Sequence, residues 1–284
     1  MLHTIDRRQW MASAAVTAGS LLAKAPQARA GELAGRIKKG LKYHMIAEDL
    51  PVTDKFKLVK DLGFEGLEVH RRYAKDPAPF VKASQAADFP IHGVLNSSDP
   101  DLKGAVDLAV EFGATSVLVV AGRVTPENAY DKNYSHTQAW LREASEYAQE
   151  KQIRLLVENV WNNFLVSPLE MARYLDEIGS PYVGGYFDIG NVMRYGFPDQ
   201  WIRILGKRIG KLDVKEYSLK KLEQEGLRKG FESEIGDGDV PWPAVRAALV
   251  EIGYRGWATA EVPAGNRQRL ADIARRMDQV LGLV

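Results

Sequence analysis

The stretch Ile153-Arg154-Leu155-Leu156-Val157-Glu158-Asn159 sets the architecture that we expect for this chain. It is a short apolar run that follows a helical segment, ends on a carboxylate and leads into a polar loop. Such a run is typical of a buried strand in a parallel sheet. A carboxylate at the end of a buried strand needs a partner, because an isolated charge is costly in an apolar core.

Three later apolar runs, at residues 183–188, 209–213 and 256–261, also end on an acid: Asp188, Asp213 and Glu261. Strands that close on acids in this way would place four carboxylates, with Glu158, at one end of one sheet. Like charges gathered so closely need a cation between them.

The composition is that of an ordinary globular protein. The chain has 284 residues, of which 45% are hydrophobic and 26% are charged, and 38 Lys and Arg against 37 Asp and Glu give a net charge of +1. This balance argues against nucleic acid or an anionic membrane surface as the main partner. The sequence has no cysteine, which excludes disulfides and thiolate metal sites.

The N-terminus has the layout of an export signal. Paired arginines, Arg7 and Arg8, precede an apolar run at residues 12–23 and the small-x-small sequence Ala28-Arg29-Ala30. The pair resembles a twin-arginine signal, which predicts a periplasmic or secreted protein. The alternative is an ordinary first helix. The run is too short and alanine-rich for a membrane anchor, so we expect no stable membrane insertion once the signal is removed.

Removing residues 1–30 leaves 254 residues, close to the about 250 of a single eight-stranded α/β barrel. Strands are predicted at 40–46, 66–70, 91–95, 116–120, 153–158, 183–188, 209–214 and 257–261. Helices are predicted at 52–62, 79–87, 102–112, 135–151, 168–178, 199–205, 242–252 and 267–281. This alternation predicts that residues 31–284 form one (β/α)8 TIM barrel.

Two further features complete the expected architecture. The alternative fold is an open doubly wound sheet, but residues 44–48 lack the glycine-rich turn that such sheets carry after their first strand. The longest irregular segment, residues 218–241, is charged and is expected to lie over the barrel mouth as a partial lid.

The alternation of side chains along the strands predicts which residues face the barrel axis. Lys211, Asp213 and Lys215 share one face of their strand, and the opposite face is apolar, as expected where a barrel packs against its helices. The acids should then converge at the C-terminal ends of the strands, where such barrels hold their active sites. The alternative is that each acid only caps a helix or pairs with a base. The same alternation turns Glu68 and His70 inward from the second strand, and Trp257, Thr259 and Glu261 inward from the eighth.

Five motifs resemble the xylose isomerase-like barrel family of sugar isomerases and epimerases. They are Val157-Glu158-Asn159, Phe187-Asp188-Ile189-Gly190-Asn191, Asp213-Val214-Lys215-Glu216, residues 236–242, and residues 253–256 with Glu261. The resemblance spans about residues 36–282, and the family includes ketose 3-epimerases, hydroxypyruvate isomerase and inosose dehydratase. It implies one divalent metal ion, bound by Glu158, Asp188, Asp213 and Glu261.

Two positions depart from the family pattern. The family usually has histidine where Asp213 stands, and often has histidine where Asn191 stands. A set of oxygen ligands alone favours Mn²⁺ or Mg²⁺ over Zn²⁺. Asn191 is expected to replace the second histidine as a hydrogen-bond donor.

The resemblance implies that Glu158 and Glu261 serve as acid and base on a carbon next to a carbonyl of a small carbohydrate substrate. The metal makes that proton acidic by stabilising negative charge on the carbonyl oxygen. Returning the proton to the other face gives epimerisation, returning it to the next carbon gives isomerisation, and loss of a β group gives elimination. The sequence leaves all three open, and oligomeric state as well.

An unphosphorylated sugar is expected, because Asp237 and Asp239 near the mouth would repel a phosphate and because phosphorylated intermediates are largely cytoplasmic. Exported relatives have been linked to 3-keto-glycoside breakdown, so the resemblance also suggests a lyase of that kind.

Lys215 either steadies an oxyanion or protonates a leaving group, or it balances the charge of the acids. His92 either touches substrate, completes a second metal site or is structural, and the two tryptophans either stack on a sugar or simply pack. The substrate-binding candidates are His44, Glu68, His70, His92, Asn191, Trp161 and Trp257.

Two other functions were considered. A metal-dependent hydrolase like the endonuclease IV barrels needs many histidines for its zinc cluster, and this chain has five histidines and no basic stripe. A non-catalytic periplasmic sugar-binding protein would explain export and the aromatic residues. It would not need two carboxylates on either side of one carbon.

Overall fold

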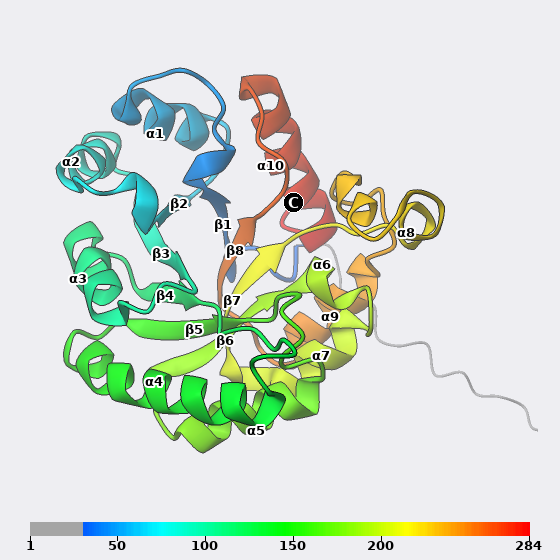
Figure 1. Ribbon diagram of the computed structural model, residues 1–284. Helices are drawn as coiled ribbons and strands as arrows, with labels where there is room; N and C mark the ends of the chain where they lie inside the picture. The colour runs from blue at the N-terminus through cyan, green and yellow to red at the C-terminus, as the bar shows by residue number, and fades with distance from the viewer. Residues whose placement is uncertain (1–30) are drawn as a thin grey trace, which may run out of the picture.

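A computed structural model of the chain describes residues 31–284, and in it eight parallel strands close into a single barrel (Figure 1). Each strand pairs with the next, and β8 pairs with β1. The single (β/α)8 TIM barrel is therefore confirmed. The expected export signal, residues 1–30, lies outside the described residues. The strands are β1 Ile37–Lys42, β2 Gly66–His70, β3 Ile91–Ser97, β4 Ser116–Val119, β5 Arg154–Glu158, β6 Val183–Asp188, β7 Ile209–Val214 and β8 Gly256–Ala260.

Helices surround the barrel, as the view in Figure 1 shows. The helices that follow the strands in turn are α1 Val52–Asp61, α2 Ala78–Ala87, α3 Leu102–Phe112, α4 Tyr130–Glu150, α5 Pro168–Ile178, α7 Pro198–Leu205, α9 Trp242–Glu251 and α10 Arg267–Leu281. Two short extra helices are α6 Ile189–Val192 and α8 Leu219–Glu225. Within residues 31–284, no helix has both the length and the apolar character needed to cross a membrane.

Local capping explains why helix ends were predictable. The carboxylate of Asp101 accepts a hydrogen bond from the N–H of Gly104 at 2.9 Å and starts α3, which ends at Gly113 with φ +66°. Ser167 caps α5 in the same way, and that helix ends at Gly179 with φ +74°. Glycine takes this left-handed conformation without the steric cost of a side chain. The predicted limits of both helices are confirmed.

The first strand differs from the prediction. It was expected at residues 40–46, but β1 covers Ile37–Lys42. The strand starts earlier because Ile37 already pairs with Gly256 of β8. After Lys42 the chain leaves the sheet in a 3-10 turn, Tyr43–Met45, so His44 lies in a turn rather than in a strand.

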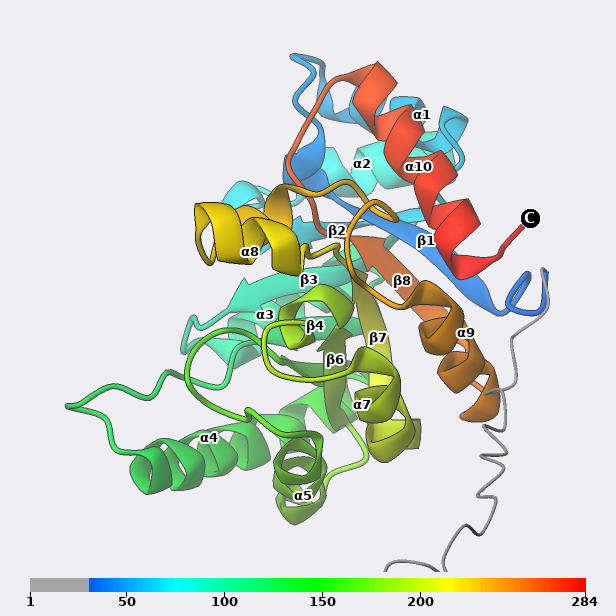
Figure 2. The same cartoon turned by 90° about the vertical axis from the view of Figure 1, so that its right-hand side faces the viewer.

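The segment 218–241 is also more regular than expected. It contains α8 and a 3-10 turn, Lys229–Glu232. The Oγ of Ser218 accepts a hydrogen bond from the N–H of Lys221 at 3.3 Å and caps α8. Figure 2 shows α8 at the end of the barrel toward which the strands point.

Apolar side chains form two separate clusters. Leu67, Val69 and Leu212 are fully buried in the large cluster between the sheet and the helices. A small cluster inside the barrel consists of Leu95, Leu118, Leu156 and Tyr186. The interior also holds buried polar side chains, including Glu68, His92 and Lys211, and the candidate site lies at the ends of the strands.

Candidate active site

The structure brings together the four acids that the sequence singled out. Glu158 ends β5, Asp188 ends β6, Asp213 lies next to the end of β7 and Glu261 directly follows β8. One ligand oxygen from each lies within 4.8 Å of the others. Asp188 and Asp213 are fully buried, whereas the side chain of Glu261 is 30% exposed. The register explains the convergence, because Asp188 pairs directly with Asp213 in the sheet.

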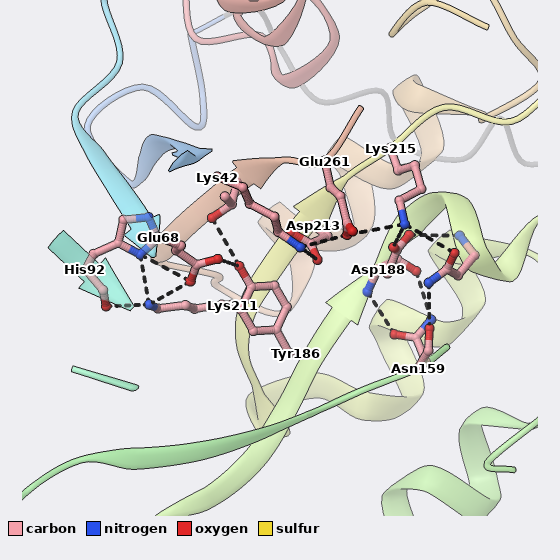
Figure 3. A network of polar contacts seen from close by, with 12 residues as sticks. Lys42, Glu68, His92, Asn159, Tyr186, Asp188, Lys211, Asp213, Lys215 and Glu261 are labelled. Atoms are coloured by element: carbon pink, nitrogen blue, oxygen red, sulfur yellow. Dashed lines mark hydrogen bonds and ion pairs between the residues drawn. The ribbon is translucent and has the colours of Figure 1, made fainter. Parts of the chain in front are cut away.

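Two lysines lie among these acids (Figure 3). The Nζ of Lys42 is 2.7 Å from both Asp213 Oδ2 and Glu261 Oε2. The Nζ of Lys215 is 2.8 Å from Asp188 Oδ2 and 3.3 Å from Glu261 Oε2. Lys215 was expected at the site, but Lys42 was not. The sequence signal for Lys42 is only a charged residue between Leu41 and Tyr43, and β1 contains two further lysines, Lys38 and Lys39.

Burial and charge move the pKa values of the two glutamates in opposite directions. Burial raises the pKa of Glu158 to about 8, and the nearby charge of Glu261 adds to the rise. Burial also acts to raise the pKa of Glu261, but the ammonium groups of Lys215 and Lys42 outweigh it and hold that pKa well below its usual value. In the absence of a bound cation, one glutamate therefore carries a proton at neutral pH while the other is ionised. A pair whose environments push their pKa values apart is suited to acid and base roles.

The donor set fits a divalent cation. Asp213 Oδ1 is buried and has no hydrogen-bond partner among the described residues. Asp188 Oδ2 also lacks a hydrogen bond within residues 31–284, although it faces Lys215 in an ion pair. Oxygens on opposite sides of one ion stand about 4.2 Å apart for Mg²⁺ and about 4.6–5.2 Å apart for Ca²⁺. The spread of 4.8 Å is thus close to what one hard cation spans.

Two asparagines hold Asp188 in place. The N–H of Asp188 donates to Asn159 Oδ1 at 2.8 Å, and Asn159 Nδ2 donates to the carbonyl of Asp188 at 2.9 Å. Asn191 donates its backbone N–H to Asp188 Oδ1 at 2.8 Å and its side-chain N–H to the carbonyl of Asn159 at 2.9 Å. The structure therefore gives the amide donor of Asn191, expected to face substrate, a partner in the protein. The role of Asn159 was not foreseen, although it follows Glu158 directly.

A buried polar layer lies toward the beginning of the strands (Figure 3). Lys211 Nζ is 2.8 Å from His92 Nδ1 and 3.3 Å from Glu68 Oε1, and the hydroxyl of Tyr186 donates to Glu68 Oε2 at 2.8 Å. The ring of Trp257 stacks on His92 with 3.9 Å between centroids. Burial and the charge of Lys211 hold the pKa of His92 well below its usual value. Glu68, His92 and Trp257 were candidates for substrate contact, but the structure pairs them with partners inside the barrel rather than placing them at its mouth.

Two neutral histidines lie at the mouth. His44 follows β1, and burial together with the charge of Lys42 lowers its pKa. Its Nδ1 atom is buried without a hydrogen-bond partner among the described residues. His70 ends β2 and accepts a hydrogen bond from the N–H of Arg72 at 3.2 Å. Burial, and then the charge of Arg72, lower the pKa of His70 to about 4.

An aromatic cluster connects the segment 218–241 to the site. The Nε1–H of Trp161 donates to the carbonyl of Asn191 at 2.8 Å. The ring of Trp161 packs on Tyr217 and on Phe231, with centroids 5.6 and 4.7 Å apart. Phe231 belongs to the segment 218–241, and its ring centroid lies 5.2 Å from the Nζ of Lys215. Trp161 therefore contacts the segment that reaches the site.

Glu216 anchors this segment with both of its carboxylate oxygens. Oε1 accepts hydrogen bonds from the N–H groups of Tyr217 and Val240, each at 3.0 Å. Oε2 accepts from the N–H of Gly236 and from the indole of Trp242, each at 2.8 Å. The sequence motifs contained these residues, but the spacing did not reveal that one carboxylate joins them.

The chain is similar to known proteins over most of its length. Residues 56–280 match the sequence family described as xylose isomerase-like TIM barrel. The 2-oxo-tetronate isomerase of Pectobacterium atrosepticum is 24% identical over 250 residues, which cover 76% of this chain and 88% of that protein. The L-ribulose 3-epimerase of Methylomonas sp. is 25% identical over 238 residues, covering 81% and 76%. The inosose dehydratase of Clostridium perfringens is 22% identical over 233 residues, covering 70% and 78%.

Solved structures show the same fold. The 3-keto-D-glucoside 4-epimerase YcjR from E. coli aligns with a TM-score of 0.71 at 13% identity, over 86% of this chain and 98% of that one. The IOLI protein, solved with a binding zinc atom, aligns with a TM-score of 0.71 at 15% identity over the same shares. The relatives in sequence act on small sugars or sugar acids as isomerases, epimerases or dehydratases, and the sequence family covers most of the barrel. The chain therefore belongs to the xylose isomerase-like TIM barrel family.

Proposed function

We propose that the protein is a divalent-metal-dependent carbohydrate isomerase, epimerase or lyase that removes a proton from the carbon next to a sugar carbonyl. The observation that carries this proposal is the cluster of four acids at the ends of β5–β8, in which Glu158 and Glu261 have opposite pKa shifts. The activities of the relatives, which include an isomerase, an epimerase and a dehydratase, support a sugar-modifying enzyme.

Glu158, Asp188, Asp213 and Glu261 would hold the cation, and we propose Mn²⁺ or Mg²⁺ rather than Zn²⁺. All four ligands are carboxylates, and hard oxygen ligands suit Mg²⁺ and Mn²⁺ better than the nitrogen and sulfur ligands typical of zinc sites. When bound, such a cation polarises the substrate carbonyl and stabilises the negative charge next to it.

The proton-transfer roles follow from exposure and charge. Glu261 is the proposed base, because two ammonium groups keep it ionised and its side chain is 30% exposed. Glu158 is its acid partner, because burial raises its pKa to about 8 and makes it the more easily protonated of the two glutamates. It is ionised as a ligand of the cation and carries a proton only when it acts as the acid. Lys215, which lies 3.3 Å from Glu261, can donate a proton to a leaving group or to an oxyanion. After Glu261 has taken the proton, donation of a proton from Glu158 to the other face of the same carbon gives epimerisation, and donation to the neighbouring carbon gives isomerisation. Protonation of a β leaving group by Lys215 gives elimination.

The proposed substrate is an unphosphorylated keto-sugar or a 3-keto-glycoside. The structural likeness to a 3-keto-D-glucoside 4-epimerase supports testing keto-glycosides first.

No observation favours the hydrolase or the sugar-binding protein. The metal-ligand cluster found within residues 31–284 contains no histidine, unlike the zinc cluster that the hydrolase would need, and the relatives are enzymes rather than binding proteins.

Isotope exchange tests the reaction. Incubation of candidate keto-sugars and 3-keto-glycosides with the enzyme and Mn²⁺ in D₂O should place deuterium on the carbon next to the carbonyl, or release the β group. The variants Glu158→Gln and Glu261→Gln should each lose roughly 10²–10⁴ in rate, the usual contribution of general acid–base catalysis. Glu146→Gln, on the exposed side of α4, should keep full activity.

Metal content must be measured in each of these variants, because both glutamates are also ligands. Turnover with neither exchange nor a primary isotope effect on that C–H bond would indicate hydride transfer or hydrolysis. Either result would contradict the proposed proton abstraction.

We also propose that residues 1–30 are an export signal that is removed before Gly31, given the paired arginines and Ala28-Arg29-Ala30. N-terminal sequencing of exported protein should start at Gly31, and a sequence starting at Met1 would contradict the proposal. The double change Arg7→Lys, Arg8→Lys should block transport if the twin-arginine route is used.

A further inference from the structure

We propose that Lys42 is a positioning residue of the metal centre, which holds one oxygen each of Asp213 and Glu261 and sets the net charge of the centre to match a single divalent cation. This inference rests on the proposed function, because it concerns the same four acids. Lys42 comes from β1, at the opposite end of the chain from β8.

The contacts of Lys42 fix its ammonium group in space. Its Nζ is 2.7 Å from Asp213 Oδ2 and 2.7 Å from Glu261 Oε2, and its side chain is 3% exposed. The ring centroid of Tyr186 lies 5.9 Å from the same Nζ. That ring cannot easily move, because Tyr186 is fully buried and its hydroxyl donates to Glu68 at 2.8 Å. The ammonium group is therefore held between a buried aromatic ring and two carboxylates.

These contacts also decide which ligand atoms remain for the cation. Lys42 engages Oδ2 of Asp213, and Oδ1 is the oxygen left buried without a hydrogen bond among the described residues. The contacts of Lys42 and Lys215 with Glu261 both go to Oε2. Each of these two acids thus presents one oxygen to the lysines and keeps the other for the cation.

The charge of the centre follows from the same residues. Four carboxylates in their ionised, ligating form and the two ammonium groups leave a net charge of minus two, which one divalent cation cancels. The layer toward the beginning of the strands adds no net charge, because Glu68 and Lys211 form an ion pair. Without Lys42 the centre would carry minus three. The extra negative charge attracts a bound cation in proportion to the charge of that cation. The affinity of the centre for a trivalent cation would therefore rise more than its affinity for a divalent one.

The test compares the affinities of Mn²⁺ and Tb³⁺ for the whole protein after its metal has been removed. Tb³⁺ binding is followed by luminescence sensitised by nearby aromatic residues, and Mn²⁺ binding by the electron paramagnetic resonance of the free ion. In Lys42→Met the ratio of Tb³⁺ to Mn²⁺ affinity should rise by about ten-fold or more. Lys39→Met is the matched control, because Lys39 is also buried in β1 but pairs with Asp278 at 2.7 Å, outside the site. Its ratio should equal that of the wild type.

A double variant keeps the test valid if Lys42→Met does not fold. Removing Lys42 alone leaves Asp213 buried without its counterion, which is destabilising, whereas removing both charges is tolerated much better. The variant Lys42→Met, Asp213→Asn has three carboxylates and one ammonium group at the centre, so its net charge is again minus two. Its ratio of affinities should stay at the wild-type value while both affinities fall. The single variant Asp213→Asn keeps both ammonium groups and has a net charge of minus one, so its ratio should lie below that of the double variant by about the factor expected for Lys42→Met. Equal ratios in Asp213→Asn and in the double variant would overturn the inference.

The outcomes separate the two proposals. If the wild type binds neither ion, the proposed metal centre is wrong, and the inference on Lys42 is wrong with it. If the wild type binds Mn²⁺ but Lys42→Met loses both affinities by the same factor, Lys42 only supports the fold, and the inference alone is overturned. A higher ratio in Lys42→Met, with no change in Lys39→Met and in the double variant, supports it.

Discussion

Asp188 uses its two carboxylate oxygens for different purposes. Oδ1 accepts the N–H of Asn191 and starts α6, whereas Oδ2 faces Lys215 and has no hydrogen bond within the described residues. One oxygen thus serves the fold and the other serves the site. A substitution that keeps the cap but removes the charge can separate these two contributions.

We expect Asp188→Ala to lose the bound divalent metal and about 1 kcal/mol of stability, because it removes both a ligand and a helix cap. Asp188→Asn keeps a capping oxygen and should lose metal affinity with a smaller loss of stability. Elemental analysis of protein purified from its own host, together with urea unfolding, checks both. Asp176→Ala, which removes only a surface ion pair with Arg208, is the control. Equal metal in the wild type and Asp188→Ala would contradict the ligand assignment.

Residue-level prediction succeeded where the signal is local. Alternation along β7 is enough to turn Asp213 inward, and the position of Glu158 at the end of an apolar run is enough to place it at the mouth. Lys42 could not be found in this way, because its partners Asp213 and Glu261 lie 171 and 219 residues away in sequence. Its role depends on the closure of the barrel, which no local pattern encodes.

At the level of elements, the segment 218–241 depends on one side chain. The change Glu216→Gln leaves one acceptor oxygen in place of two and puts an NH₂ group where the other oxygen was. Two of the four hydrogen bonds to Glu216 are then lost, because two N–H donors face that NH₂ group. We expect a loss of about 1–3 kcal/mol and faster proteolysis within residues 218–241. Limited proteolysis and urea unfolding measure both effects, with Glu223→Gln on the exposed side of α8 as control. Cleavage at the wild-type rate would show that Glu216 does not anchor the segment.

Element boundaries were predictable where side chains cap them. Asp101 and Gly113 mark the ends of α3 in the sequence, and the structure agrees. The first strand was misplaced because its start is fixed by pairing with β8, more than two hundred residues away. The helix α8 was missed because it is only seven residues long and mostly charged or polar, with Leu219 and Leu222 as its only apolar residues.

At the scale of the whole molecule, buried neutral histidines make stability depend on pH. The pKa of His70 is lowered from 6.5 to about 4, and that of His92 is also well below its usual value. The unfolded chain therefore takes up protons first as the pH falls, so the contribution of these groups is present above about pH 6.5 and is lost as the pH falls toward 4.

The buried Glu158, whose pKa is raised to about 8, acts in the opposite sense over this range, so the effect of His70 is isolated by comparing variants. We expect the free energy of unfolding at pH 5, relative to that at pH 7, to be higher in His70→Gln than in the wild type. Urea unfolding at both pH values measures the difference. His136→Gln, on the exposed surface of α4, is the control and should keep the wild-type dependence. The same change between the two pH values in His70→Gln as in the wild type would show that His70 does not contribute to the pH dependence.

The four acids proposed as ligands all come from the second half of the barrel, from β5 to the residue after β8. The loops after β1 to β4 surround the same mouth but supply none of these ligands. Sequence change in those loops can therefore alter which molecules enter the mouth while the second half keeps the chemistry intact. A lineage built on this division can acquire new substrates by changes in the loops after β1 to β4, while selection holds constant the strand ends and Lys42 of β1.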